Sequence, residues 1–250
     1  IAGPGFINFF LQEQAEFAVL GNILSQKQAF GRGNAGQGQK IQVEFVSANP
    51  TSSLHVGHGR GAAYGMTVAT LLEAAGFQVQ REYYVNDAGR QMAILATSTF
   101  LRYIELCGEN FKFPSNGYRG DYMRDIAQTV VDAHGRTWVK PAADVFANVP
   151  ADEAKNEAGE VIDGDKEAHI DGLIDNARAL LGPEGYDVFF RAALDSILGD
   201  IKDDLAGFGV TYDEWFSEKS LADSGAIDRA IKTLQANGTV YEKGGALWFK

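Results

Sequence analysis

The sequence of 250 residues has one cysteine, few basic side chains and no long apolar run. Because Cys107 has no second cysteine to pair with, an internal disulfide and a cysteine-based zinc site are both excluded. No segment approaches the roughly 20 apolar residues that a membrane-spanning helix needs, and no basic, cleavable leader begins the chain. We therefore expect a cytoplasmic protein without a membrane partner.

Positive charge is also scarce, since 22 Lys and Arg face 33 Asp and Glu, for a formal net charge of −11. Phosphate contacts need basic residues, so this balance argues against a general nucleic-acid binder but leaves a local contact open. The apolar content of 45% is ordinary for a globular protein with a sizeable core. The chain starts without Met and ends on the strand-like "GALWFK", from which we expect a piece of a longer protein.

A strand, a helix and a second strand follow one another between residues 41 and 87. Ile41, Val43 and Phe45 alternate on one face of a strand, and residues 55–75 favour a helix that Gly76 terminates. Residues 77–87 are again strand-like. A connection of this length favours a parallel βαβ unit, as in α/β nucleotide-binding domains.

The remaining chain is mostly helical by its spacing of apolar residues. We expect a strand and a helix in 6–25, a flexible glycine-rich linker in 31–40, and an exposed acidic segment in 140–167. Asp121 is the expected N-cap of a helix that ends at Gly135. Further helices are expected at 89–108, 170–181, 189–205 and 227–234, with an extended link at 210–218 and a hairpin at 240–249. The apolar stripe predicted for the helix at 55–75 includes Leu71.

The stretch "ANPTSSLHVGHGRGAAYG", residues 48–65, places His55 and His58 at the mouth of the predicted helix. Three interpretations are open. Two histidines three apart can share a metal, but no third ligand has a recognisable spacing and HExxH is absent. They can also be ordinary polar residues at a helix start. Finally, Gly57 and Gly59 let a ligand approach the backbone, where N–H groups and the helix dipole favour a phosphate.

The tetrad His55-Val56-Gly57-His58 resembles the HIGH signature of class I aminoacyl-tRNA synthetases. The longer runs "VEFVSANPTSSLHVGHGRGAAYG" and "REYYVNDAGRQ", together with "NGYRGDYMRDIA", "WFSEKSL" and "VYEKGGALWF", resemble the bacterial arginyl-tRNA synthetase family. "AGPGFINF" is similar to the end of the N-terminal domain of that family. The resemblance covers nearly the whole chain in family order, and it implies a Rossmann-like parallel-sheet domain with a mostly helical insertion.

The resemblance implies roles for particular residues. His55 and His58 would stabilise the phosphates of ATP, given with Mg²⁺ as a substrate complex, while Gly57 and Gly59 would make room for the nucleotide. Ser47, Asn49 and Glu218 would hold arginine, with Glu218 receiving the guanidinium through two parallel N–H bonds. Asn86, Asp87 and Gln91 either line the same pocket or form a capping turn. The signature motif comprises Ala48, Asn49, Pro50, Thr51, Ser52, Ser53, Leu54, His55, Val56, Gly57 and His58.

The implied activity is ATP-dependent attachment of arginine to tRNA(Arg) through arginyl-adenylate, by a monomer without a bound metal. The expected divisions are 1–38 for an N-terminal tail and linker, 39–109 and 191–250 for the catalytic domain, and 110–190 for the insertion. Two departures stand out: Ser52-Ser53 replaces the family's frequent Gly-Pro, and the second signature, KMSKS, is absent from these 250 residues. We therefore expect this stretch to be inactive alone.

Two other functions compete with this one. The first is another HIGH-type nucleotidylyl transferase that forms a small-molecule adenylate, which would not need Glu218 as a guanidinium receptor. The second is a binding module that keeps the fold without the chemistry.

Overall fold

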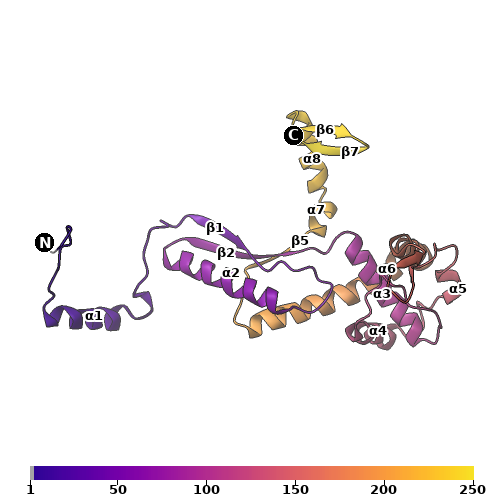
Figure 1. The fold of residues 1–250 in the computed structure, drawn as a ribbon, viewed down its shortest axis with the longest axis horizontal. Helices are drawn as coiled ribbons and strands as arrows, with labels where there is room; N and C mark the ends of the chain where they lie inside the picture. Colours follow the sequence, from indigo (N-terminus) through magenta and orange to yellow (C-terminus); the bar gives the residue numbers. More distant parts are fainter. Residues whose placement is uncertain (1–2) are drawn as a thin grey trace.

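A three-stranded parallel sheet forms the centre of the computed structural model, which describes residues 3–250 (Figure 1). The strand order is β1 (Lys40–Glu44), β2 (Gln78–Val85), β5 (Glu214–Ser217), and both neighbouring pairs are parallel. The carboxyl ends of all three strands therefore meet at one edge of the sheet. This arrangement confirms the predicted α/β class with a parallel sheet. The segment expected to be an extended link at 210–218 supplies the third strand.

Helix α2 (Val56–Ala74) joins β1 to β2, which confirms the predicted βαβ unit. Its buried residues Ala62, Gly65 and Ala69 lie on one face, and Gly76 adopts a φ of +90° just beyond its C-terminus. Gly65 permits close packing, because a Cβ there would lie 2.2 Å from the ring of Phe45. The expectation that Leu71 belongs to the apolar stripe is wrong, since it is 64% exposed.

Helices α3 (Arg90–Leu106), α4 (Asp121–His134), α5 (Ala142–Val145) and α6 (Lys166–Gly207) form the helical part. The two helices expected at 170–181 and 189–205 are the halves of α6, which is kinked where Gly182 takes a φ of +66° ahead of Pro183. One apolar core lies among α3, α4, α5 and α6 as far as Phe189, and a second joins the sheet, α2, α3, α4 and the later part of α6. Helix α3 contributes to both cores, so it connects the sheet to the helical part.

The N-terminal segment differs from expectation. Helix α1 (Glu13–Gln26) and a short 3-10 turn, η1 (Lys27–Ala29), are present, but residues 7–12 form no strand. The segment expected to be a flexible linker, residues 31–40, contains no helix, but its backbone is hydrogen-bonded to the rest of the protein. The N–H groups of Gly33, Gly36 and Gly38 donate to the carbonyls of residues 74–76 at 2.8–2.9 Å. The segment is therefore fastened to the end of α2.

Two further expectations need correction. Asp121 is the first residue of α4 rather than its N-cap, which is Gly120, and no side chain caps this helix. The acidic segment is largely exposed, but it contains β3 (Ala154–Lys155), β4 (Val161–Asp163) and the fully buried Val145 of α5. The Asp152 carboxylate also accepts from the backbone N–H of Ser115 at 2.8 Å. The segment therefore carries local structure that its composition does not indicate.

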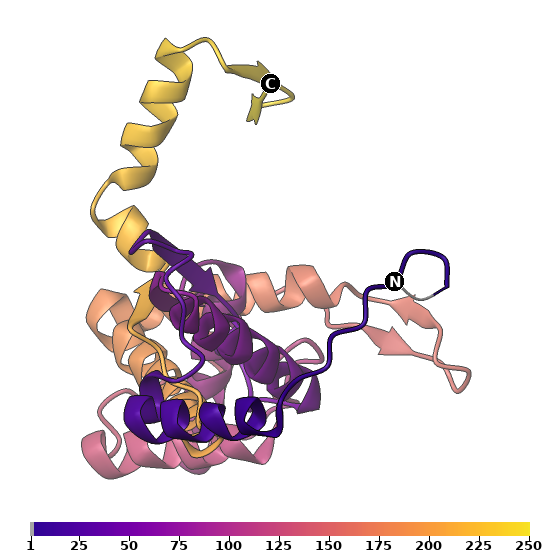
Figure 2. The same ribbon diagram turned by 90° about the vertical axis from the view of Figure 1, so that its left-hand side faces the viewer.

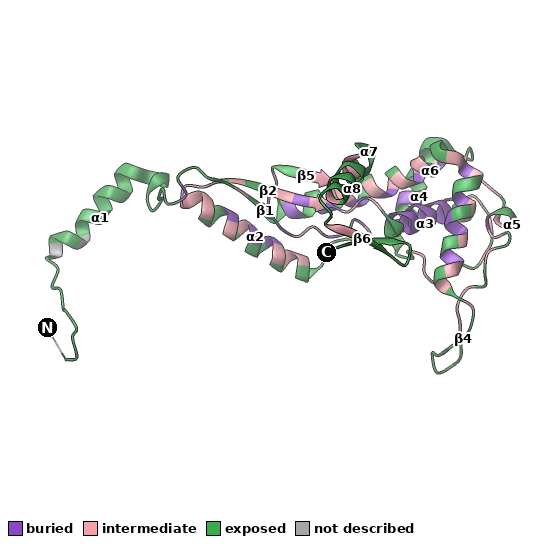
Figure 3. Cartoon of the chain, turned by 90° about the horizontal axis from the view of Figure 1, so that it is seen from above, coloured by how far each residue is buried: buried purple, intermediate pink, exposed green. Residues whose placement is uncertain are grey.

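The C-terminal residues form α7 (Lys219–Asp223), α8 (Ala226–Ala236) and a hairpin of β6 (Val240–Lys243) and β7 (Ala246–Phe249). The hairpin confirms the turn predicted at Gly244–Gly245. In Figure 2 this yellow segment projects away from the sheet. Figure 3 shows that α1 and the α8–β7 region are mainly exposed, whereas α3 is buried. Across residues 3–250, no helix is both long and apolar enough to cross a membrane.

Candidate active site

The loop that leads from β1 to α2 has an unusual backbone. Val46 and Ser47 have φ values of +67° and +42°, a left-handed region that L-residues avoid and that a β-branched side chain tolerates least. The hydroxyl of Ser47 accepts the N–H of Tyr84 on β2 at 3.0 Å. Such local strain persists only where the surroundings enforce it, and it concentrates at functional sites.

Three tyrosines enforce this loop conformation. Each phenol donates to a loop carbonyl: Tyr83 to Ala48 at 3.0 Å, Tyr122 to Thr51 at 2.8 Å, and Tyr212 to Phe45 at 3.2 Å. Burial raises the pKa of Tyr83 to about 12, and it also raises the pKa values of Tyr122 and Tyr212. All three phenols therefore remain donors at neutral pH. The sequence does not indicate this role for the three tyrosines, because they come from β2, α4 and the segment before β5, and no local motif links them to the loop.

The two histidines form the N-terminal cap of α2. The Nδ1 atom of His55 accepts from the N–H of Gly57 at 3.1 Å, and the N–H of His55 donates to Nδ1 of His58 at 3.2 Å. The two rings stack with their centroids 3.7 Å apart. Since both Nδ1 atoms accept, each imidazole is assigned as the neutral tautomer with its proton on Nε2. The pKa of His58 is lowered, mainly by burial and secondarily by His55.

Glycines 57 and 59 have different surroundings. A Cβ on Gly57 would lie 2.9 Å from Cε1 of His55, so the capping ring needs this glycine. Nothing lies within 4 Å of a Cβ built on Gly59, which leaves open space beside the first turn. The expectation of free N–H groups at this helix start is wrong for residues 57–59. The N–H of Gly57 donates to Nδ1 of His55, and the N–H groups of His58 and Gly59 donate to the His55 carbonyl at 2.8 and 3.2 Å.

The polar residues predicted around the amino-acid site lie together. Asn49 donates to Gln91 Oε1 at 2.7 Å. The Asn86 amide must present its nitrogen to Glu218, because its oxygen would otherwise face the carboxylate. It then donates to Glu218 Oε2 at 2.7 Å, and its oxygen lies 3.2 Å from Asn49 Oδ1, a contact between two acceptors. The structure thus joins Gln91, Asn49, Asn86 and Glu218 into one polar cluster at the carboxyl ends of the strands.

Asp87 is buried and directed toward β5. Its two carboxylate oxygens accept from Ser217 Oγ at 2.6 Å and from the N–H of Lys219 at 2.8 Å. Tyr84 on β2, which no sequence motif marks as a site residue, lies near Glu218. The pKa of its phenol is raised first by burial and next by the negative charge of Glu218.

The members of the signature segment differ in exposure. Ala48 and Pro50 are buried, Thr51, Leu54 and His58 are half-buried, and Asn49, Ser52, Ser53, His55, Val56 and Gly57 are exposed. Within residues 3–250, no hydrogen bond links the histidine pair to the polar cluster. The two groups therefore flank the carboxyl end of β1 as separate arrangements.

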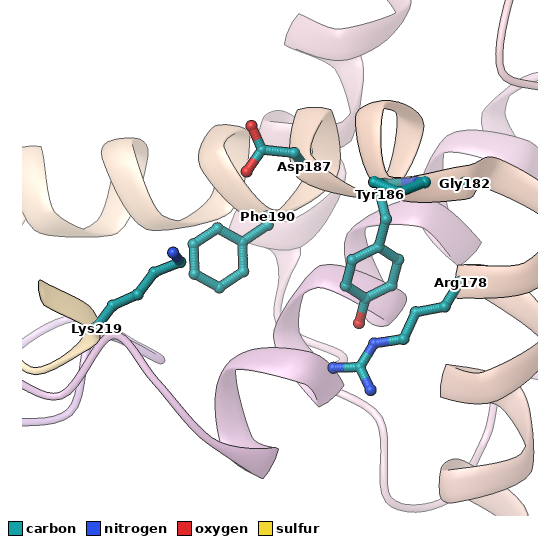
Figure 4. A pocket seen from close by; sticks show the side chains of 7 residues that line it. Arg178, Gly182, Tyr186, Asp187, Phe190 and Lys219 are labelled. Atoms are coloured by element: carbon teal, nitrogen blue, oxygen red, sulfur yellow. The ribbon is translucent and has the colours of Figure 1, made fainter. Parts of the chain in front are cut away.

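One recess adjoins Lys219, the residue after Glu218, and another adjoins Gln91 of the polar cluster. The first, of about 350 Å³, lies between the kink of α6 and Lys219, with Arg178, Tyr186, Asp187 and Phe190 around it (Figure 4). The other, of about 310 Å³, lies beside Gln91 and is lined by Arg90 and residues 115–118. No group of three His, Cys, Asp or Glu side chains is placed to hold a metal in the described part of the chain.

The chain is similar to known proteins at two levels, a family model and curated relatives. Residues 19–105 match the family described as tRNA synthetases class I (R), catalytic domain. This match confirms the resemblance of the HIGH-like tetrad to that class. The curated relatives that match the full length of this chain are bacterial arginine–tRNA ligases. The chain is 61% identical to the arginine–tRNA ligases of Acinetobacter baumannii strain AYE and of Hydrogenovibrio crunogenus, over 100% of its length.

The fold agrees with these similarities. A Campylobacter jejuni structure described as an arginyl-tRNA synthetase superimposes with a TM-score of 0.68 at 27% sequence identity, covering 96% of this chain and 43% of that one. The chain spans about 42% of the length of the curated relatives it matches.

Proposed function

We propose that this chain supplies the arginine subsite and part of the ATP subsite of an arginine–tRNA ligase. In the proposed reaction, the carboxylate of arginine attacks the α-phosphate of ATP and pyrophosphate leaves. The arginyl group then passes from the adenylate to the 3′ end of tRNA(Arg), releasing AMP. The similarity of the chain to bacterial arginine–tRNA ligases supports this proposal.

The polar cluster is the observation that carries the proposal. Glu218 offers a carboxylate to a guanidinium fork, which takes two parallel N–H bonds that the ammonium of lysine does not reproduce. Asn49 lies in the same cluster, with an amide that suits the α-amino or carboxylate end of an amino acid. In open α/β sheets, ligands bind at this edge, beyond the carboxyl ends of the strands.

The histidine pair supports the ATP subsite. With Nδ1 occupied, the Nε2–H groups of His55 and His58 are the donors available to phosphate oxygens. Donors fixed in advance stabilise charge that develops in the transition state, so no covalent intermediate is required. Gly57 and the open space beside Gly59 let the nucleotide approach the first turn of α2. In this proposal Mg²⁺ enters with ATP as part of the substrate.

Other features belong to the same proposal. Ser47 joins the arginine subsite, and Asp87 and Gln91 support its walls. We also propose the domain divisions at residues 38, 109 and 190. The protein is proposed to be a cytoplasmic monomer, and its tRNA contacts are proposed to lie mainly outside these 250 residues. The alternative of another small-molecule adenylate former is not favoured, since the relatives that match the chain are arginine–tRNA ligases.

A Glu218→Gln substitution tests the arginine subsite in a full-length arginine–tRNA ligase that carries this sequence. We expect KM for arginine to rise at least tenfold with KM for ATP unchanged, because a hydrogen bond to a charged group contributes about 1.5–3 kcal/mol. ATP–pyrophosphate exchange in the presence of tRNA measures both. Glu214→Gln, at an exposed glutamate on β5, the strand that precedes Glu218, is the matched control. An unchanged KM for arginine in the Glu218 variant would exclude this subsite.

The chain of 250 residues is expected to be inactive by itself, because it lacks a KMSKS-type segment. Arginine-dependent ATP–pyrophosphate exchange by this chain alone would contradict that expectation.

A further inference from the structure

The backbone around Asn86 holds the backbone around Glu218. The carbonyl of Val85 accepts the N–H of Glu218 at 3.0 Å. On the other side of Asn86, the buried Asp87 accepts from Ser217 Oγ at 2.6 Å and from the N–H of Lys219 at 2.8 Å. The neighbours of Asn86 are thus bonded to Glu218 and to both of its neighbours, and the two residues face one another across the ends of β2 and β5.

The Asn86 side chain completes this arrangement. Its amide nitrogen donates to Glu218 Oε2 at 2.7 Å, and its oxygen lies 3.2 Å from Asn49 Oδ1. A hydrogen bond between the two asparagines therefore requires the Asn49 amide, and with it the Gln91 amide, to turn as well, because Asn49 otherwise directs its nitrogen to Gln91. An amide has two donors and one acceptor oxygen, so it can contact a carboxylate and a second amide simultaneously. One bond to Oε2 leaves a lone pair on each carboxylate oxygen, which is what a guanidinium fork requires.

We infer that Asn86 is a positioning residue that sets the distance between Glu218 and Asn49, and thereby selects the length of the substrate side chain. This inference rests on the proposed function, in which Glu218 receives the guanidinium and Asn49 the α-amino or carboxylate end. The spacing between these groups must match three methylenes for arginine. Because the substrate bridges both residues, an amide fixed between them defines that spacing without touching the reacting atoms.

The test uses arginine and two analogues, one methylene shorter and one longer, in a full-length arginine–tRNA ligase that carries this sequence. With Asn86→Ala, KM for arginine should rise on the order of tenfold, because Glu218 loses a charge-assisted bond. The preference for arginine over both analogues, measured as kcat/KM ratios, should fall by a similar factor. Asn86→Asp should lose more, since a second carboxylate would face Glu218. KM for ATP should stay unchanged in both variants.

A control separates positioning from general stability. Asn176 on α6 also uses its amide twice, donating to the carbonyls of Val145 and Ala147 at 2.9 Å, in the helical part away from Glu218. Asn176→Ala should lower the thermal midpoint but leave the length preference intact. The inference is overturned if the Asn86 variants keep the wild-type length preference, or if they raise KM for ATP together with KM for arginine.

The two proposals can fail separately. If Glu218→Gln leaves KM for arginine unchanged, the arginine subsite itself is wrong. If Glu218→Gln raises KM for arginine and the Asn86 variants retain length discrimination, only the positioning role is lost.

Discussion

The carboxylate of Asp87 accepts the backbone N–H of Lys219 at 2.8 Å, and this bond joins the end of β2 to the start of α7. A second bond, from the hydroxyl of Ser217, ties the same carboxylate to the last residue of β5. Glu218 lies between these two partners. The buried Asp87 therefore fixes the local backbone from which the proposed guanidinium receptor projects.

Asp87→Asn should weaken both the fold and the arginine subsite. The new NH₂ group would replace one of the two acceptor oxygens, so it would face either the N–H of Lys219 or the hydroxyl of Ser217. The other bond would lose its charged acceptor, and hydrogen bonds to a charged group contribute about 1.5–3 kcal/mol each. We expect a loss of about 2 kcal/mol in the free energy of unfolding by urea. Asp132→Asn, at an exposed aspartate of α4, is the control and should change little. Equal stability of the two variants would refute this role for Asp87.

Gly57→Ala and Gly59→Ala form a matched pair in the first turn of α2. Alanine gains up to about 1 kcal/mol over glycine within a helix. At Gly59, where a Cβ meets open space, that gain should appear as increased stability. At Gly57 the Cβ would displace the His55 ring, and the lost cap costs about 1 kcal/mol, so the net stability should hardly change.

Activity distinguishes the same two variants more sharply. Because Gly57→Ala moves His55 away from His58, kcat of the full-length enzyme should fall at least tenfold at nearly constant thermal midpoint. Gly59→Ala should instead raise KM for ATP if the nucleotide approaches this turn. Wild-type kcat in the Gly57 variant would argue against the proposed role of the stacked pair.

Local patterns predicted much of this fold. Apolar periodicity and terminal glycines located α2, α3, β2 and the C-terminal hairpin, because these elements are specified within a few residues. The strand β5 was expected only as an extended link, since its four residues become a strand by pairing with β2, over a hundred positions earlier. Leu71 was expected on the buried face of α2, but it is exposed. Periodicity predicts which residues share a helical face, but not how much of that face packs against another element.

The sequence selected candidate residues that lie together in space only where a motif contains them. The family resemblance selected Asn49, Asn86, Gln91 and Glu218, and the structure joins these four side chains. It did not select Tyr83, Tyr122 or Tyr212, which hold the loop through its carbonyls. A tyrosine in a strand or helix has the same sequence signature whether its hydroxyl meets water or a distant carbonyl. Such contacts become visible only in three dimensions.

Stability should depend on pH through His58. Its pKa is lowered from the ordinary 6.5, so the unfolded chain binds a proton at a higher pH than the folded one. The free energy of unfolding should therefore fall as pH drops through about 6.5, and level off below the lowered folded pKa. Urea denaturation between pH 8 and 5 measures this slope, which His58→Gln should reduce. A His58→Gln variant that keeps the full wild-type slope would show that the pH dependence comes from another group.

Close packing of α2 on the loop can be tested at Gly65. A Cβ there would lie 2.2–2.5 Å from the Phe45 side chain, so Gly65→Ala should cost about 1–3 kcal/mol despite its better helix propensity. Gly61→Ala, with open space around its Cβ, should be neutral or stabilising. If Phe45 is the obstacle, Gly65→Ala combined with Phe45→Leu should destabilise less than the sum of the single changes.

The same collision links packing to the site. Phe45 stacks on Tyr212 at 4.6 Å, and its carbonyl accepts the Tyr212 phenol at the start of the strained loop. A displaced Phe45 should therefore shift the loop that carries Asn49 and leads to His55. We expect Gly65→Ala to raise KM for both arginine and ATP in the full-length enzyme, whereas Glu218→Gln raises only the first. Unchanged values for both substrates, together with the predicted loss of stability, would show that the loop keeps its shape independently of this contact.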